Sequence, residues 1–305
     1  MKCPSSIPRI ACSARVRANR EIEQSVFELV IERKITAYET GPETGPAEKT
    51  VSIPAPCPGQ FFMLRARPSG VLLGRPISIF KSDKTTLTFL ILKKGAGTEE
   101  LCSLRKGDHV DILGPVGNHF MQPDELFSEE RKKELVAGKN DGLLASAISY
   151  LLETMQAGET GPLRIAIAGG GIGIAPVAGF AQTLPPSSFD FYACFRSDPY
   201  GIEDIANRAK NLYITTEDGS AGTRGILSDI FDPSKYDLVY ACGPVPMLKY
   251  IQNCCPGHKP FAFLSLEQRM ACGAGACLGC TVKTIHGNRR CCVDGPVFNA
   301  AEVIL

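Results

Sequence analysis

The 305-residue sequence predicts a multidomain protein of class α/β plus β, with three folded parts. Three observations predict this class. Short strand-like runs separated by turn residues fill the first 120 residues, and strand, turn and helix patterns alternate from Leu163 onward. A cysteine-rich loop then closes the chain. Many short strands are typical of an antiparallel barrel, whereas strand-helix alternation is typical of a parallel sheet with helices on both faces.

Composition limits the classes of partner. A hydrophobic content of 44% and a charged content of 21% are ordinary for a globular protein with a sizeable core. The formal net charge of +1 gives no strong field for nucleic acid or an anionic membrane, and no apolar run reaches the length of a membrane span. Thirteen cysteines without a secretory segment predict a cytoplasmic location, where thiols serve metals and packing rather than disulfides.

The predicted barrel covers residues 1–120. We expect a loose lead-in with one short strand at most over residues 1–20, and a surface loop with no chemistry over residues 40–58, at whose start the near-repeat E-T-G-P occurs twice between Glu39 and Pro46. The expected strands are Val26–Ile31, Gly59–Arg65, Pro76–Phe80, Leu87–Leu92 and His109–Gly114. Residues 121–162 are polar and favour helix, so we interpret them as a linker or helical insertion with a solvated charged face.

The parallel sheet is predicted over residues 163–259. Arg164–Ala168 reads as a buried strand, Gly169–Gly173 as a turn, and Ala175 as the start of a helix. Further strands are expected at Phe189–Phe195, Leu212–Thr216 and Leu238–Cys242.

The glycine-rich turn indicates a nucleotide site. Gly171-x-Gly173-x-x-Pro176 follows a buried strand directly, so a pyrophosphate can approach a backbone turn and a helix N-terminus without interference from a Cβ. A turn that serves packing alone is the competing interpretation. Cys242 and Gly243 end a later strand, where ligands of open parallel sheets bind, so we expect Cys242 beside a nicotinamide ring rather than as a mere small buried residue.

The cysteine spacing indicates an iron–sulfur cluster. Cys272, Cys277 and Cys280 form C-x4-C-x2-C, and one more cysteine follows at Cys291 or Cys292. This is the thiolate set of a plant-type [2Fe-2S] cluster, and small residues between the first two cysteines allow a tight loop. Structural zinc usually takes paired C-x2-C knuckles, and disulfides need an oxidising compartment. Spacing alone accepts either of the last two cysteines.

A motif in the barrel is compatible with a phosphate-bearing cofactor. Arg75 opens the run R-P-I-S, and its forked donors suit a phosphate, while the Ser78 hydroxyl could bond a ring nitrogen.

The order of these motifs resembles the ferredoxin reductase superfamily. R-P-I-S is followed by G-A-G-T, L-G-P-V-G-N, G-G-G-I-G-I-A-P and C-G-P. The C-terminal part, from Leu266 through the cysteine loop to C-V-D-G-P-V-F, resembles the electron-transfer subunits of class 1B dihydroorotate dehydrogenase. This resemblance spans nearly the whole chain apart from the lead-in and the two insertions.

The resemblance implies cofactors and residues for each part. It implies an FAD-binding β-barrel over residues 1–120, a nucleotide-binding domain for NAD(H) over 163–259 and a small C-terminal [2Fe-2S] module over 260–305. The residues expected to hold FAD are Arg75, Pro76, Ile77, Ser78, Ile91, Leu92, Lys93, Gly97 and Thr98. Those expected to hold NAD(H) are Gly169, Gly170, Gly171, Ile172, Gly173, Cys242 and Gly243. The implied cluster ligands are Cys272, Cys277, Cys280 and Cys292, because the family's last cysteine directly precedes V-D-G-P-V-F.

The resemblance also implies an NAD-linked oxidoreductase. Electrons would pass between NADH, FAD, the cluster and an FMN-containing catalytic subunit that interconverts dihydroorotate and orotate in pyrimidine biosynthesis, in a heterotetramer with two copies of each chain. No acid, base or nucleophile of this chain is required. Two alternatives remain: a reductase subunit of another ferredoxin-linked or flavoprotein complex, and a redox-sensing iron–sulfur protein without turnover.

Overall fold

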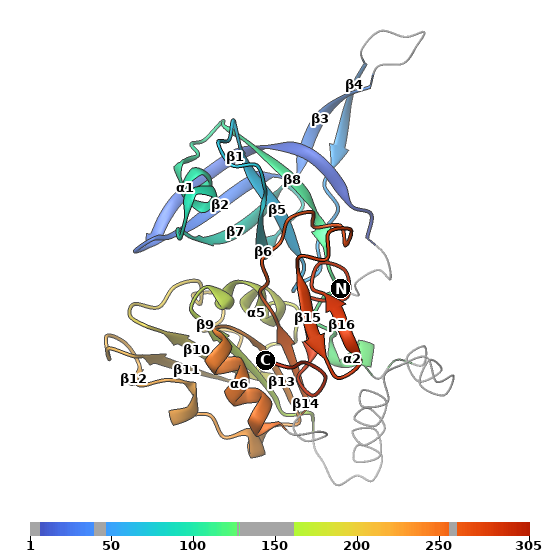
Figure 1. The fold of residues 1–305 in the computed structure, drawn as a ribbon. Coiled ribbons are helices and arrows are strands. Elements are labelled where there is room, and N and C mark those ends of the chain that lie inside the picture. Colours follow the sequence, from blue (N-terminus) through green and yellow to red (C-terminus); the bar gives the residue numbers. More distant parts are fainter. Residues whose placement is uncertain (1–6, 40–46, 127, 129–161, 256–260) are drawn as a thin grey trace.

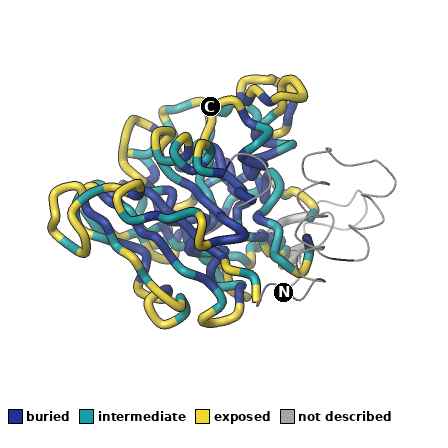
Figure 2. Tube along the Cα trace, turned by 90° about the horizontal axis from the view of Figure 1, so that it is seen from below, coloured by how far each residue is buried: buried dark blue, intermediate teal, exposed yellow. Residues whose placement is uncertain are grey.

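The computed structural model describes residues 7–39, 47–126, 128, 162–255 and 261–305. It contains a β-barrel, a mixed α/β layer below it and a C-terminal hairpin beside both (Figure 1). Buried residues concentrate in the strands, and exposed residues in the connecting loops (Figure 2). No helix among the described residues is long and apolar enough to span a membrane.

Six strands close the barrel in the order β1-β2-β7-β6-β5-β8, every neighbouring pair being antiparallel. Inward-facing side chains such as Ala14, Leu29 and Phe89 are fully buried in its core. One short helix, α1 (Ala96–Ser103), lies between β7 and β8. The barrel strands are β1 (Ile10–Glu23), β2 (Val26–Glu32), β5 (Phe61–Arg67), β6 (Arg75–Ser82), β7 (Thr86–Leu92) and β8 (His109–Val116).

The structure differs from the N-terminal prediction in two places. The expected lead-in with one short strand at most contains the 14-residue strand β1, whose length was hidden by its polar residues because only one face, including Ala14 and Val16, is buried. Part of the expected surface loop is also a strand. β4 (Ala47–Ser52) pairs with β3 (Lys34–Glu39) as an antiparallel ribbon that projects from the barrel, and residues 40–46 lie outside the described residues.

The second layer is a seven-stranded sheet with the order β12-β11-β10-β9-β13-β14-β17. All neighbouring strands are parallel except β17, which runs antiparallel to β14. Its strands are β9 (Ile165–Gly170), β10 (Phe189–Phe195), β11 (Asn211–Thr216), β12 (Thr223–Arg224), β13 (Leu238–Cys242), β14 (Phe261–Ser265) and β17 (Val297–Asn299).

Two helices cover opposite faces of this sheet. α5 (Ile174–Ala181) packs through Phe180 onto Tyr240 of β13, whereas α6 (Val245–Cys254) packs in the cluster that includes Val239 and Ala241. Short 3-10 turns η1, η2 and η3 cover Gly171–Gly173, Leu227–Asp229 and Pro233–Lys235. The expected insertion begins with α2 (Pro123–Leu126), but residues 127 and 129–161 lie outside the described residues.

The C-terminal segment leaves the sheet and returns to it. After β14 the chain forms the cysteine loop and the hairpin β15 (Thr281–Thr284) and β16 (Gly287–Arg290), then pairs again as β17. Strand pairing therefore runs across the predicted boundary between residues 259 and 260, because β14 hydrogen-bonds to β13. The division into domains with independent boundaries stays a prediction.

Candidate functional site

The barrel brings Arg75 against the start of α1. The guanidinium lies so close to Gly97 that a Cβ there would stand 2.4 Å from Nε of Arg75 and 2.6 Å from its Cζ. Nη1 of Arg75 donates to the carbonyl of Leu73 at 3.0 Å, which holds the side chain over the helix. A cationic fork therefore stands beside the N-terminus of a helix, and this arrangement is suited to a phosphate.

Thr98 shapes the turn before this helix. Its Oγ1 accepts hydrogen bonds from the backbone N–H groups of Lys94 and Gly95 and donates to the carbonyl of Gly95. On the neighbouring strand end, the Ile91 side chain lies in the barrel core, whereas Leu92 is 37% exposed. Of this predicted pair only Leu92 therefore offers its side chain to a ligand, and Ile91 can contribute only its backbone.

The glycine-rich turn lies where the strand order of the sheet reverses. β9 is flanked by β10 on one side and by β13 on the other, and ligands of open parallel sheets bind at such a switch point. Gly171 has φ +52° and no atom within 4 Å of where a Cβ would be, so its backbone faces open space. Gly173, in contrast, would place a Cβ 2.5 Å from the carbonyl oxygen of Cys242.

The two segments predicted to hold NAD(H) pack side by side. Cys242 pairs in register with Gly169, and a Cβ on Gly243 would lie 3.1 Å from the backbone nitrogen of Gly170. Gly170 is itself closed in, because a Cβ there would stand 2.6 Å from the sulfur of Met247. Cys242 is buried, and this burial raises the pKa of its thiol. Ile172 packs partly buried against the core formed with α5, so it supports the turn.

The four predicted cluster cysteines occur as two pairs. The backbone N–H groups of Ala274 and Cys277 point at Sγ of Cys272 at 3.4 and 3.5 Å and lower the pKa of that thiol to about 6. Sγ of Cys280 lies 3.3 Å from Sγ of Cys292, where burial raises the pKa of Cys292 to about 11. Thiolate ligands need backbone amide donors, which the first pair has at Cys272. They also need a neighbouring thiol within reach of the same iron, which the second pair has in Cys280 and Cys292.

The adjacent cysteines point in different directions. Sγ of Cys291 donates to the carbonyl of Leu266 at 3.3 Å and is fully buried, whereas Cys292 faces Cys280. Outside this loop, buried Cys102 and Cys255 serve packing as expected, but the expectation that no cysteine forms a bridge is wrong at Cys57, which is disulfide-bonded.

The sequence alone indicated no role for one residue of this region. Asn118, in the L-G-P-V-G-N motif, donates through Nδ2 to the carbonyls of Asp294 and Val297, and the Val297 N–H donates to its Oδ1. No local signal distinguishes this asparagine from an ordinary turn residue, because its partners are more than 170 positions away.

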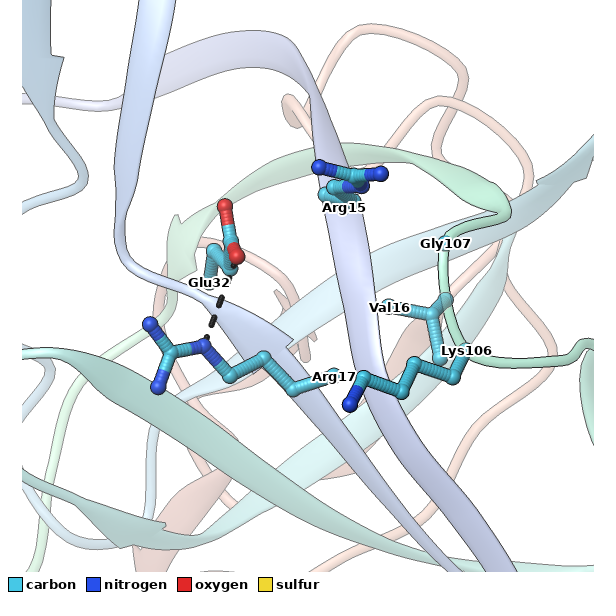
Figure 3. Close-up of a pocket in the computed structure, with 6 residues that line it drawn as sticks. All are labelled: Arg15, Val16, Arg17, Glu32, Lys106 and Gly107. Atoms are coloured by element: carbon cyan, nitrogen blue, oxygen red, sulfur yellow. Dashed lines mark hydrogen bonds and ion pairs between the residues drawn. The ribbon is translucent and has the colours of Figure 1, made fainter.

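One surface hollow lies away from these motifs. It has a volume of about 520 Å³ and is lined by Arg15, Val16, Arg17, Glu32, Lys106 and Gly107 (Figure 3). Arg15 pairs with His109 at the start of β8, whereas Asn118 follows the end of that strand. Arg17 is already paired with Glu32 at 3.4 Å. We therefore exclude this hollow from the candidate site.

Two known proteins resemble this chain over most of its length. The electron transfer subunit of dihydroorotate dehydrogenase B (NAD(+)) from Clostridium acetobutylicum is 37% identical over 248 residues, which cover 81% of this chain and 86% of that protein. The corresponding subunit from Clostridium perfringens is 32% identical and covers 95% of this chain and 96% of its own length. The chain belongs to this family of electron transfer subunits.

Two further findings agree with membership of the dihydroorotate dehydrogenase B family. Residues 267–304 match the model of the iron-sulfur cluster binding domain of dihydroorotate dehydrogenase B. Among solved structures, an NADH-dependent reduced ferredoxin-NADP oxidoreductase described for flavin-based electron bifurcation is 21% identical. It has a TM-score of 0.66 and covers 95% of this chain and 89% of its own. That likeness supports the barrel-and-sheet fold.

Proposed function

We propose that this chain transfers electrons between NADH and the catalytic subunit of a dihydroorotate dehydrogenase, by way of FAD and a [2Fe-2S] cluster. The observation that carries the proposal is that three groups of residues meet where the barrel contacts the rest of the chain: the arginine-bearing strand, the glycine-rich unit and the cysteine loop. The arginine-bearing strand β6 packs on α5 of the glycine-rich unit, since Gly179 of α5 lies against the carbonyl of Phe80. The cysteine loop lies against the barrel, where Gly273 meets Met63.

The barrel residues fit FAD. Arg75 and the first turn of α1 would hold the pyrophosphate, because a guanidinium fork and a helix N-terminus both favour an anionic group. Ser78 on β6 and the segment 91–93 at the end of the adjoining strand β7 would contact the flavin ring. Gly97 permits this arrangement, since any side chain there would displace Arg75.

The sheet residues fit NADH. Gly171 presents backbone without a Cβ to open space, which lets a pyrophosphate approach η1 and the start of α5. Cys242 and Gly243, at the end of the neighbouring strand, would then border the nicotinamide. The likeness to NAD(+)-linked relatives supports NADH as the dinucleotide.

The cysteine loop fits a two-iron cluster better than a single ion. Two separate thiol pairs, Cys272 with Cys277 and Cys280 with Cys292, suit a cluster in which each iron takes two thiolates. We therefore propose Cys292, rather than Cys291, as the fourth ligand.

A bound flavin supplies the conversion between the two-electron chemistry of NADH and the one-electron chemistry of the cluster. The residues of this chain bind and orient these groups, and none is required as an acid, base or nucleophile. The family name implies a catalytic partner. An FMN group in that partner, a heterotetramer with two copies of each chain and a cytoplasmic location are further parts of the proposal.

Anaerobic purification followed by iron, sulfide and flavin analysis tests the proposal. We expect two irons, two sulfides and one FAD per chain, and bleaching of both flavin and cluster absorption when NADH is added. Addition of a purified dihydroorotate dehydrogenase catalytic subunit with orotate should then restore the absorption. Zinc in place of iron, absence of flavin, or no response to NADH would each refute the proposal.

A further inference from the structure

The barrel is joined to the cysteine-bearing segment by four hydrogen bonds at Asn118. Its backbone N–H donates to the carbonyl of Gly295 at 2.6 Å. Its Nδ2 donates to the carbonyls of Asp294 and Val297 at 3.0 and 2.7 Å, and the Val297 N–H donates to its Oδ1 at 2.9 Å. Both side-chain donors and the side-chain acceptor are thus used on one turn of the C-terminal segment.

The backbones also meet closely at this place. Gly117 has φ +82°, and a Cβ there would stand 2.5 Å from the carbonyl oxygen of Gly295 and 2.6 Å from Cδ of Pro296. Only glycine therefore allows the turn to approach. We call Gly117, Asn118 and the turn formed by residues 294–297 the interlock.

The interlock lies on a short path between two proposed cofactor sites. On the barrel side, Asn118 follows Val116 by two residues, and Val116 pairs with Phe61, whose other neighbour is Ser78 on β6. On the cysteine side, the turn begins two residues after Cys292. Since neighbouring strands stand about 4.8 Å apart, a displacement of the turn changes directly the separation of Ser78 and Cys292.

A second contact supports the same segment but is less specific. A Cβ on Gly273 would lie 2.6 Å from Cγ of Met63 and 3.6 Å from Cδ2 of Leu113, so the cysteine loop rests on apolar side chains of β5 and β8. Apolar contact is non-directional, whereas hydrogen bonds are favourable only within narrow limits of distance and angle. Packing can keep the loop on the barrel, but the register of the contact depends on the interlock.

We propose that Asn118 is a positioning residue that fixes the separation between the flavin-holding strand and the cluster loop. Electron passage between two centres falls steeply with their separation, so loosening the interlock slows that passage while NADH oxidation at the flavin continues. Because this inference rests on the proposed function, its test first establishes that the wild-type holoprotein contains both cofactors and responds to NADH.

The test compares Asn118→Asp with Gln252→Glu in the holoprotein. Asn118→Asp keeps the acceptor for the Val297 N–H but turns oxygen lone pairs toward the carbonyls of Asp294 and Val297. Gln252 donates through Nε2 to the carbonyls of Ala300 and Val303 at 2.6 and 2.8 Å. Gln252→Glu is a matched control, because it removes two equivalent donor bonds to the same C-terminal segment without touching the barrel.

Two measurements are made on each variant. Anaerobic stopped-flow absorption follows the bleaching of flavin and of cluster after NADH is added, and hydrogen exchange reports the Val297 amide. For Asn118→Asp we expect flavin bleaching within about twofold of wild type, unchanged iron content and faster exchange at Val297. Cluster bleaching should slow by clearly more than this twofold margin, because electron passage falls steeply with the separation of the two centres. Gln252→Glu should leave both rates unchanged.

Three outcomes decide against the inference. If the cluster of Asn118→Asp bleaches at the wild-type rate, the interlock does not set the separation. If Gln252→Glu slows cluster bleaching equally, general loosening of the C-terminal segment is the cause. If wild type itself lacks a cofactor or does not respond to NADH, the proposed function has failed and the inference fails with it. Should Asn118→Asp not fold, Asn118→Ser, which is too short to reach both carbonyls, is judged by the same comparison.

Discussion

Replacing Gly97 with alanine tests the proposed FAD site directly. The new Cβ would stand 2.4 Å from Nε, 2.6 Å from Cζ and 2.7 Å from Nη2 of Arg75. These atoms belong to the end of a flexible side chain, so the guanidinium moves and the backbone keeps its place. Alanine is favoured over glycine within a helix by up to about 1 kcal/mol, and the thermal midpoint should therefore not fall.

The magnitude follows from what the displaced guanidinium would bind. A hydrogen bond to a charged group contributes about 1.5–3 kcal/mol, and each 1.4 kcal/mol is about tenfold in affinity. We therefore expect Gly97→Ala to weaken FAD binding by about tenfold to 150-fold. Arg75→Ala should weaken it by a similar factor, because both changes remove the same contact.

Titration of flavin-depleted protein with FAD, followed by flavin fluorescence, measures these affinities. The double variant of Gly97 and Arg75 supplies the decisive comparison, because two changes that act on one contact are not additive. We expect the double variant to bind FAD no more weakly than Arg75→Ala. Wild-type affinity in Gly97→Ala, or full additivity in the double variant, would refute the assigned role of Arg75.

Three further predictions concern other parts of the chain. Cys280→Ser should lose the cluster, measured as iron per chain, whereas Cys291→Ser should keep it, because the Cys291 thiol faces the Leu266 carbonyl; equal loss in both would contradict the ligand assignment. Asp83 accepts four hydrogen bonds from two threonines in the β6–β7 turn, which hold the pKa of its carboxyl well below the usual range. Its contribution is present above the unfolded-state pKa of about 3.9 and is lost as the pH falls toward the lower folded-state value. Asp83→Asn should therefore lower the urea midpoint at pH 7 more than at pH 3, and a constant difference would argue against this origin. Asp237→Ala leaves the backbone N–H and guanidinium of Arg164 without their carboxylate, which should lower the free energy of unfolding by about 1–3 kcal/mol in urea titrations; a change below about 0.5 kcal/mol would contradict this.

The sequence by itself determined the features that are local in the chain. The spacing of Cys272, Cys277 and Cys280 requires one tight loop, and small residues between the first two allow it. The turn at Gly169–Gly173 needs only a buried strand before it and a helix after it, and the observed β9, η1 and α5 have that order. Such signals are readable because the residues that form each unit are neighbours in sequence.

Sequence pattern failed where one face of an element is polar or where a partner is distant. β1 carries many charged residues on its outer face, so only closure of the barrel by pairing with β2 and β8 makes it a strand. Likewise, a charged segment such as Ala47–Ser52 becomes a strand through its ribbon partner β3. In both cases the hydrogen bonds come from a partner strand, and the composition of β1 or β4 alone does not favour a strand.

Only the tertiary structure decided which side chains face one another. Cys291 and Cys292 are equivalent by spacing, but adjacent residues of the turn point different ways, and the fold aims Cys292 at Cys280. Asn118 gains its role only because the turn at residues 294–297 returns to the end of β8. Local pattern fixes which units form, whereas the contact between units depends on long-range packing and directional hydrogen bonds that leave no mark in nearby sequence.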